Sequence, residues 1–248
     1  MNSQISIEGI PNIPFVEASQ DVGEIILAAI ESAGIELRDN DIICIASKVI
    51  SIAEERVVKL TDIVASDTAQ QIHQKVPRKD ARIIQFIINQ TGKDDASRVV
   101  VQDNYIAGGL PNGLRLTSAG VDKMDSETVI LLPENSDQSA KLIGQKILES
   151  TGVNIGIIIT DSDGREDKKG ATQIAIGVYG IPPLRITESL MDDGKKSMTE
   201  ETLCDMLAAS AALIMGQRGT NKPAVLIRGV DYIFNPNVGI KDSLNDLK

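Results

Sequence analysis

The stretch that decides the fold runs from Val153 to Arg165 and reads Val-Asn-Ile-Gly-Ile-Ile-Ile-Thr-Asp-Ser-Asp-Gly-Arg. Its first part, 153–160, is apolar and rich in β-branched residues, which predicts a buried strand. Two acids separated by one hydroxyl residue follow at once, so we expect the strand to stop there. The sequence therefore predicts a strand end that carries oxygen ligands.

The three residues after this predicted strand are Asp161, Ser162 and Asp163. A buried strand fixes its last residues closely, and carboxylate and hydroxyl oxygens are hard donors that suit Mg²⁺ or Mn²⁺. On residue types alone, a plain polar turn with a helix cap remains an open alternative. A calcium-binding loop is excluded, because residues 166–170 lack further ligands at the required spacing.

The composition is that of a globular protein. With 248 residues, of which 42% are hydrophobic, the chain can form one large domain or two small ones. It has no apolar run near the roughly 20 residues of a membrane span, and no export signal at its start. Cys44 and Cys204 lie in apolar patterns and are interpreted as buried small hydrophobes. We therefore expect a cytoplasmic protein that does not bind membranes.

The net charge of −10 argues against a nucleic-acid partner, since such proteins gather Lys and Arg to neutralise phosphates. One tight basic group, Lys168 and Lys169 beside Arg165, suits a small phosphate rather than a polymer. The single histidine, His73, lies among glutamines and is interpreted as a surface residue. A histidine-based catalytic triad or zinc site is therefore not expected.

Helical and strand patterns are mixed along the chain, which predicts an α+β fold. Apolar residues at helical spacing predict helices at 22–33, 80–91, 139–150 and 200–215. Asp21 is the expected cap of the first helix and Thr199 of the last. Strands are expected at 42–46, 99–101, 113–117, 128–132 and 171–179. The segment 48–60 is ambiguous in period, and 181–199 is expected to be an irregular lid or dimer arm.

Two further predicted strands also end in polar residues. Ser47 and Lys48 follow strand 42–46, and Asp122 and Asp125 follow strand 113–117. For the two aspartates an ordinary loop remains the alternative. The loop 216–222 could wrap phosphates through its amides, but neither a Walker loop nor a Gly-x-Gly-x-x-Gly motif is present. From the residues alone we infer metal-assisted chemistry on a phosphate-bearing small molecule.

Taken together, these segments resemble the coenzyme F420-0:L-glutamate ligase family over nearly the whole chain. The strongest match is to Thr-Asp-(Thr/Ser)-x-Gly-Arg-x-x-Arg-x-Gly, found here from Thr160 to Gly170 with Lys168 at the second arginine. The family's Ser-Lys-x-x-Ser-Lys-Ala-Glu-Gly-Arg resembles 47–56, and its Asn-Ala-Gly-Ile-Asp-x-Ser-Asn resembles 118–125. Shorter matches lie at 9–11, 175–177, 214–216 and 228–229.

The resemblance implies a GTP-dependent enzyme that adds L-glutamate through a γ-linkage to coenzyme F420-0, by way of an acyl phosphate. It implies one domain over 1–248 with two interleaved subdomains, mixed and antiparallel sheets flanked by helices, and an intertwined homodimer. The implied cofactors are GTP as a substrate and Mg²⁺ or Mn²⁺, with K⁺ as a further candidate ion. The implied partners are F420-0, L-glutamate and a second copy of the chain.

The resemblance also assigns roles to residues. Asp122 and Asp161 would hold the first ion, and Ser162 and Gln217 would hold the second. Arg165 and Lys168 would offset charge during catalysis. The implied nucleotide contacts are Ile10, Pro11, Asn12, Ile13, Ser47, Lys48, Asp125, Met215, Gly216, Gln217, Arg218, Gly219, Thr220, Asn221 and Lys222.

Three positions depart from the family pattern. Ile52 replaces a usual lysine and cannot pair with a phosphate, and Asp125 replaces an asparagine and adds negative charge. Gln217 stands where some members have an acidic ligand, and a neutral amide binds Mg²⁺ more weakly. These differences leave two alternatives open: a paralogue that joins an amino acid to another carboxylate acceptor, and a non-catalytic nucleotide-binding protein.

Overall fold

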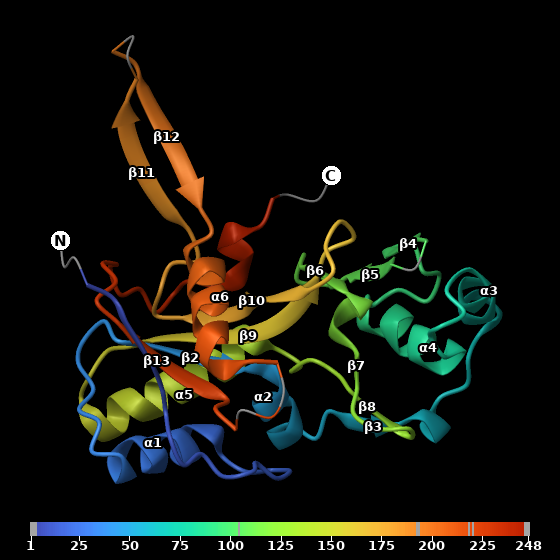
Figure 1. Cartoon of the computed structure of the whole chain (residues 1–248), viewed down its shortest axis with the longest axis horizontal. Coiled ribbons are helices and arrows are strands. Elements are labelled where there is room, and N and C mark those ends of the chain that lie inside the picture. Colours follow the sequence, from blue (N-terminus) through green and yellow to red (C-terminus); the bar gives the residue numbers. More distant parts are fainter. Residues whose placement is uncertain (1–3, 104, 192–193, 218, 220, 246–248) are drawn as a thin grey trace.

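The computed structural model describes residues 4–103, 105–191, 194–217, 219 and 221–245. The described part of the chain is a mixed α+β structure, as the sequence predicts (Figure 1). None of its helices is long and apolar enough to cross a lipid bilayer.

A five-stranded sheet in the order β1-β13-β2-β9-β10 forms the core of one group of elements. β2 and β9 run parallel, and the other neighbouring pairs are antiparallel. β2 and β13 consist almost entirely of buried apolar residues, because helices cover both faces of the sheet. The strand bounds are Ser6–Gly9 for β1, Ile42–Ala46 for β2, Gly156–Gly164 for β9, Ala171–Tyr179 for β10 and Ala224–Arg228 for β13.

Three long helices cover this sheet. α1 (Val22–Ser32) and α5 (Ser136–Thr151) lie on one face, and α6 (Leu203–Met215) lies on the other (Figure 1). Asp21 caps α1 as predicted, since its carboxylate accepts a hydrogen bond from Glu24 N at 3.0 Å. Buried residues of each helix, such as Ile26, Ile143 and Leu207, pack in one core with the strands.

β10 forms one edge of the sheet, and two carboxylates close that edge. Ala175 N donates to Asp205 Oδ1 of α6 at 2.9 Å, and Val178 N donates to Asp137 Oδ1 of α5 at 2.8 Å. Gly177 lies between them, and a Cβ there would lie 2.4 Å from the backbone of α5 at Ser136. Helices rather than a further strand thus satisfy the amides at these positions.

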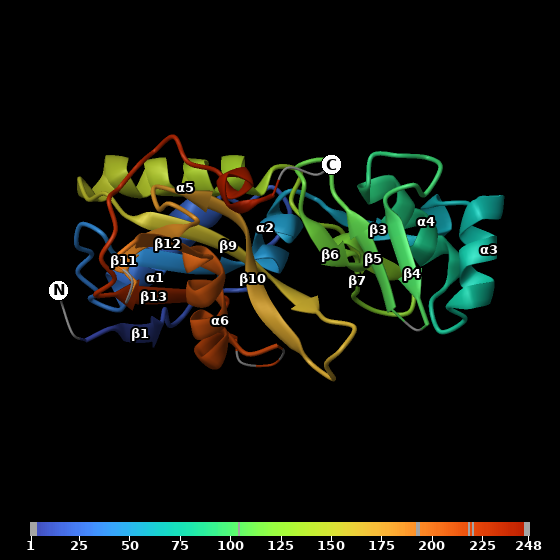
Figure 2. The same ribbon diagram turned by 90° about the horizontal axis from the view of Figure 1, so that it is seen from above.

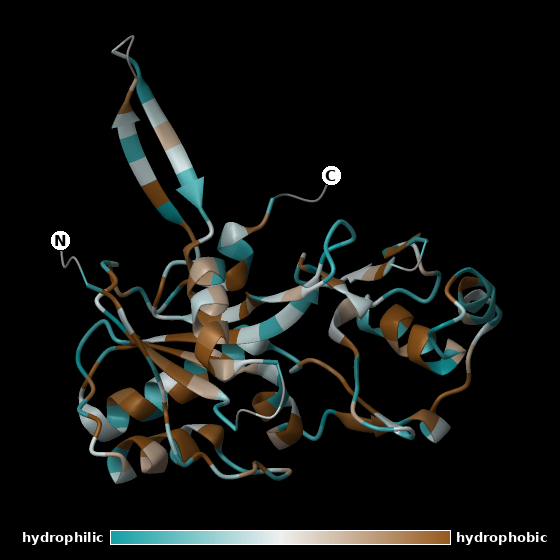
Figure 3. Ribbon diagram, in the orientation of Figure 1, coloured by the Kyte–Doolittle hydropathy of each residue, from teal (hydrophilic) through white to brown (hydrophobic). Residues whose placement is uncertain are grey.

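The elements from β3 to β8 form a second group beside the sheet, and α2 lies between the two groups (Figure 2). This group packs around α4, whose Ile84, Ile87 and Ile88 are buried, and Figure 3 shows its hydrophobic residues concentrated on that helix. Its strands form two sheets, β3-β8-β7 and β4-β5-β6. The bounds are Ser47–Ala53 for α2 and, within the second group, Val57–Lys59 for β3, Asp67–Lys75 for α3, Ala81–Gln90 for α4, Val99–Gln102 for β4, Tyr105–Gly109 for β5, Arg115–Thr117 for β6, Asp122–Lys123 for β7 and Thr128–Ile130 for β8.

The strand predicted to stop at Thr160 is longer than expected. β9 continues through the acidic residues to Gly164, because these residues pair with the first part of β10, and the end of β9 also bonds to β6. Thr117 N donates to Asp163 Oδ1 at 2.8 Å, and Thr117 Oγ1 donates to Gly164 O at 2.8 Å. A strand of the central sheet is thereby joined directly to the second group of elements.

The prediction that segment 181–199 is irregular is wrong. β11 (Arg185–Leu190) and β12 (Lys196–Glu201) pair as an antiparallel hairpin that projects away from the rest of the chain (Figure 1). Thr199 lies in β12, so it does not cap α6, and Thr202 is the residue that precedes that helix. Only Ile186 and Leu190 of β11 are apolar and all six of its residues are exposed, so the sequence has no alternating pattern that would indicate this strand.

Candidate functional site

The ends of β2 and β9 bring Ser47 and Asp161 together. In the parallel pair, Ala46 is level with Thr160, so the residues that follow each of them lie side by side. Ser47 Oγ donates to Asp161 Oδ1 at 2.6 Å. The two strand ends that the sequence identifies as polar are therefore neighbours in space.

Asp122 reaches the same place from the second group of elements. A cavity of about 10 Å³, roughly the space needed for one water molecule, lies between the two groups. It is lined by Ser47, Lys48, Ser51, Gly120, Asp122, Ile130, Leu131, Leu132 and Asp161. The structure thus brings together the two carboxylates that are predicted to share one cation.

An unusual turn leads into Asp122. Ser118, Ala119 and Gly120 all have left-handed backbone conformations, with φ values of 56°, 49° and 70°. At Gly120 no side chain fits, because a Cβ would lie 2.4 Å from Leu132. This turn directs the chain into β7, where Asp122 pairs with Ile130.

The electrostatics of the cavity favour a cation. Burial raises the pKa of the Asp161 carboxyl to about 7, the Ser47 hydrogen bond opposes that rise, and the charge of Asp122 adds to it. The described residues contain no cluster of three or more His, Cys, Asp or Glu side chains. Two carboxylates that leave other positions to water and phosphate oxygens are the usual protein contribution to a Mg²⁺ site, so these residues fit such an ion.

Ser162 faces the other side of the sheet from Asp161, since side chains alternate along a strand. Thr160 shares its face, and Thr160 Oγ1 donates to Met215 Sδ at 3.9 Å at the end of α6. Ser162 is therefore on the α6 face, near the start of the loop that contains Gln217. The first and second predicted ion sites lie on opposite faces of β9.

Gln173 is a polar residue that the sequence interpretation missed. It is level with Ser162 on β10, is 7% exposed, and its Oε1 has no hydrogen-bond partner among the described residues. A buried acceptor without a donor or cation is costly, so this oxygen is a further candidate ligand beside Ser162. Its only signal in the sequence is a glutamine inside an otherwise small and apolar strand.

The predicted nucleotide-binding segments also meet at this end of the sheet. A Cβ on Gly9 would lie 2.9 Å from both Ile214 Cγ2 and Lys222 Cδ, which places the segment 10–13 beside the loop 215–222. Ile10 N donates to Ala224 O at 3.0 Å, and the Ile10 side chain is fully buried in the core. That side chain therefore packs and does not face a ligand. The predicted contacts Arg218 and Thr220 lie outside the described residues.

Arg165 and Lys168 lie in a separate hollow. They sit in the turn between β9 and β10, where Arg165 Nη2 pairs with Asp167 Oδ2 at 2.8 Å. This groove has a volume of about 490 Å³ and is lined by Arg78, Gln102, Asp103, Tyr105, Arg165, Glu166, Asp167 and Lys168. The two predicted catalytic cations are thus outside the walls of the Asp122 cavity.

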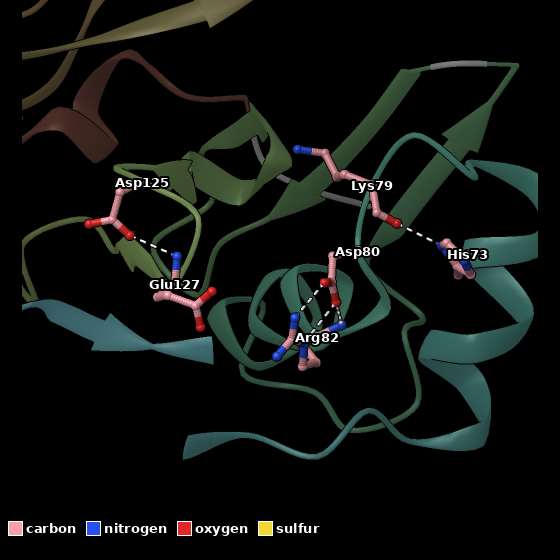
Figure 4. Close-up of polar contacts among 6 residues, drawn as sticks. All are labelled: His73, Lys79, Asp80, Arg82, Asp125 and Glu127. Atoms are coloured by element: carbon pink, nitrogen blue, oxygen red, sulfur yellow. Dashed lines mark hydrogen bonds and ion pairs between the residues drawn. The ribbon is translucent and has the colours of Figure 1, made fainter. Parts of the chain in front are cut away.

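Asp125 and Ile52, two of the departures from the family pattern, are not among the residues that line the cavity. The Asp125 carboxylate is used in the turn after β7, where Oδ1 accepts from Glu127 N at 2.7 Å and Thr128 N at 2.8 Å (Figure 4). Hydrogen bonds from Thr128 and Glu127 hold the pKa of Asp125 below its ordinary value. Neither substitution adds charge to, or removes charge from, the cavity wall.

Comparison with known proteins decides the family. The model of the family described as F420-0:Gamma-glutamyl ligase matches residues 11–229. The chain belongs to this family. The match spans the aspartates of the cavity, Arg165 and Lys168 of the groove and the loop after α6, so the resemblance inferred from the sequence is confirmed.

Individual family members are similar over almost their full length. The chain is 34% identical to the coenzyme F420:L-glutamate ligase of Methanosarcina mazei over 238 residues, which cover 94% of this chain and 89% of that protein. It is 33% identical to the Methanosarcina barkeri protein of the same name, with coverage of 94% and 89%. The Methanothermobacter thermautotrophicus protein of that name is 32% identical, with coverage of 92% and 90%.

Proposed function

We propose that the chain is a GTP-dependent ligase that joins L-glutamate through a γ-linkage to the carboxylate of coenzyme F420-0. The observation that carries the proposal is the meeting of Asp122 and Asp161 in one cavity, at the sheet end where segments 10–13 and 215–222 also lie. The names of the related enzymes support the acceptor and the amino acid.

The chemistry has two steps. First, an acceptor carboxylate oxygen bonds to the γ-phosphorus while the bond to the β–γ bridging oxygen breaks, and GDP leaves with the electron pair. Next, the glutamate amine bonds to the acyl carbon, phosphate leaves with the electrons of the broken C–O bond, and the amine gives up a proton. A divalent cation held by Asp122 and Asp161 would neutralise charge on the phosphates.

Arg165 and Lys168 have a different place in this proposal. Arg165 is four residues along the chain from Asp161, which is roughly 13 Å in an extended strand. At that distance they would bind the remoter anionic parts of the acceptor or the glutamate rather than the triphosphate. Ser162, Gln173 and the loop with Gln217 would hold a second ion, for which K⁺ is a candidate because the side-chain donors are neutral.

We also propose that the chain forms a homodimer through the β11–β12 hairpin. Ile186, Leu190 and Met198 share one face of this hairpin and are 55%, 74% and 61% exposed. Glu188, Lys196 and Glu200 share this face, and since an isolated two-stranded hairpin is only marginally stable, a partner surface over the three apolar side chains would stabilise it. In the same proposal the two groups of elements are subdomains of one cytoplasmic enzyme.

The test is incubation of the protein with GTP, Mn²⁺, L-glutamate and F420-0. We expect a glutamylated product, detected by mass spectrometry, together with one GDP and one phosphate per bond formed. Asp161→Asn is the matched control and should form less than about a hundredth of the product. GDP release with other carboxylate acceptors but not F420-0 would contradict the acceptor, and nucleotide binding without any GDP release would contradict catalysis.

A further inference from the structure

Lys79 is a half-buried cation beside the cavity that the sequence interpretation did not identify. It lies between α3 and α4, and its Nζ donates to Ser118 Oγ at 2.7 Å, in the turn that leads to Asp122. No carboxylate of the described residues lies within ion-pair distance of this ammonium. A half-buried ammonium that meets only a neutral hydroxyl keeps its charge available for an anion.

Hydrogen bonds hold both the backbone and the side chain of Lys79, the latter through Ser118. His73 Nδ1 donates to Lys79 O at 2.7 Å, and Asp80 caps α4 by accepting from Arg82 N at 2.8 Å. Figure 4 shows the Lys79 carbonyl facing His73 while the ammonium points the opposite way. The residue is thus held on both sides, which pre-organises its ammonium.

Charge links Lys79 to the cavity. Burial lowers the pKa of Lys79 and the charge of Arg78 lowers it further, whereas the negative charge of Asp122 raises it. Asp122 is therefore close enough to act on the ammonium although the two form no ion pair. An anion bound to a cation at Asp122 would therefore also lie within reach of the Lys79 ammonium.

We propose that Lys79 binds the γ-phosphoryl group of GTP during its transfer to the acceptor carboxylate. This inference rests on the function proposed above. As the new carboxylate–phosphorus bond forms and the bond to GDP breaks, negative charge increases on the oxygens around the transferred group. Lys79 keeps all its protons and stabilises that charge through its fixed ammonium.

The test compares Lys79→Ala with Lys75→Ala, which removes an exposed lysine at the end of α3. Calorimetry would measure the binding of Mn²⁺ with GDP and with a non-hydrolysable GTP analogue. Lys79→Ala should weaken the analogue about tenfold and leave GDP within twofold, because GDP lacks the group that Lys79 contacts. Acceptor-dependent GTP cleavage should fall roughly 100-fold and be partly restored by added ethylammonium.

A structural role for Lys79 predicts the opposite pattern. Equal losses for GDP and the analogue, or an unchanged rate of GTP cleavage in Lys79→Ala, would overturn the proposal. Lys79→Arg should bind the analogue better than Lys79→Ala, since it keeps the charge. If the unaltered protein binds the analogue but cleaves no GTP, the proposed ligase fails while the binding comparison still tests Lys79.

Discussion

Ser47 and Asp161 are 114 positions apart in the sequence, yet the Ser47 hydroxyl donates to Asp161 Oδ1 at 2.6 Å. The bond orients the carboxylate and supports its charged form. We expect Ser47→Ala to weaken Mn²⁺-dependent GDP binding by about fivefold, the usual effect of losing about 1 kcal/mol of hydrogen bonding. Calorimetry provides the measurement. Ser32→Ala, in α1, is the control, and an equal loss there would contradict the assignment.

Gly120 permits the turn before Asp122. Gly120→Ala combines a left-handed φ of 70° with an overlap on Leu132, so we expect a loss of about 3 kcal/mol in the free energy of unfolding. Gly152→Ala is the matched control, because its φ is 73° but nothing lies within 4 Å of the added Cβ. It should cost about 1 kcal/mol. Urea unfolding of both variants measures the difference, and equal losses would exclude the overlap with Leu132.

Arg228 belongs to the Arg-Gly pair at 228–229 that resembles the family's. It has a structural role at the end of the sheet opposite the Asp161 cavity. Its Nε and Nη2 each donate to the Asp41 carboxylate at 2.7 Å, and Asp41 is 1% exposed. Arg228→Met leaves this buried carboxylate without its cation and should cost about 3 kcal/mol. Adding Asp41→Asn should recover part of the loss in denaturant unfolding. If the two losses simply add, the pair is not coupled.

Asp80 gives a pH-dependent prediction. Hydrogen bonding to the Arg82 side chain lowers the pKa of Asp80 from 3.8 to about 2. A carboxyl group with a depressed pKa stabilises the folded state at pH values above its pKa in the unfolded chain. That stability is lost as the pH falls from 3.8 toward 2. Asp80→Asn keeps a capping side chain, so its melting temperature should lie below wild type at pH 6 and converge with it near pH 2. A difference that stays constant with pH would mean that capping alone matters.

The hairpin proposal predicts a change in molecular mass. Ile186→Glu together with Met198→Glu replaces two exposed apolar side chains of the β11–β12 hairpin with charges and should convert a dimer into a monomer in light scattering. Thr187→Glu together with Ser197→Glu, on the other face, is the control with the same added charge. Dissociation by both pairs equally would indicate a non-specific effect of charge.

The sequence predicts the parts of the site that depend on strand ends. The apolar run before Asp161 and the run before Ser47 both indicate buried strands, and parallel pairing makes their ends adjacent. Helix caps are equally local, which is why Asp21 is correctly predicted. Asp122 is also recognised in the sequence as a residue that follows a strand, but its pairing with Asp161 comes from the family resemblance, because it depends on a turn that the local sequence does not indicate.

Other features depend on tertiary contacts and carry no local signal. From the sequence, Asp163 is expected to be an oxygen ligand next to Asp161. It instead accepts a hydrogen bond from Thr117 N, because the end of β9 lies beside β6. Lys79 and Gln173 are ordinary polar residues until the fold buries them beside Ser118 and Ser162. The sequence shows which functional groups these side chains carry. Only the packing of the two groups of elements shows what surrounds them.

The carboxylates of Asp205 and Asp137 have a consequence for how copies of the chain associate. They occupy the amides of Ala175 and Val178, so β10 offers no continuous ladder to an incoming strand. Edge-to-edge polymerisation of the central sheet through β10 is thereby blocked. The homodimer proposed above would therefore use surfaces away from β10, such as the projecting hairpin.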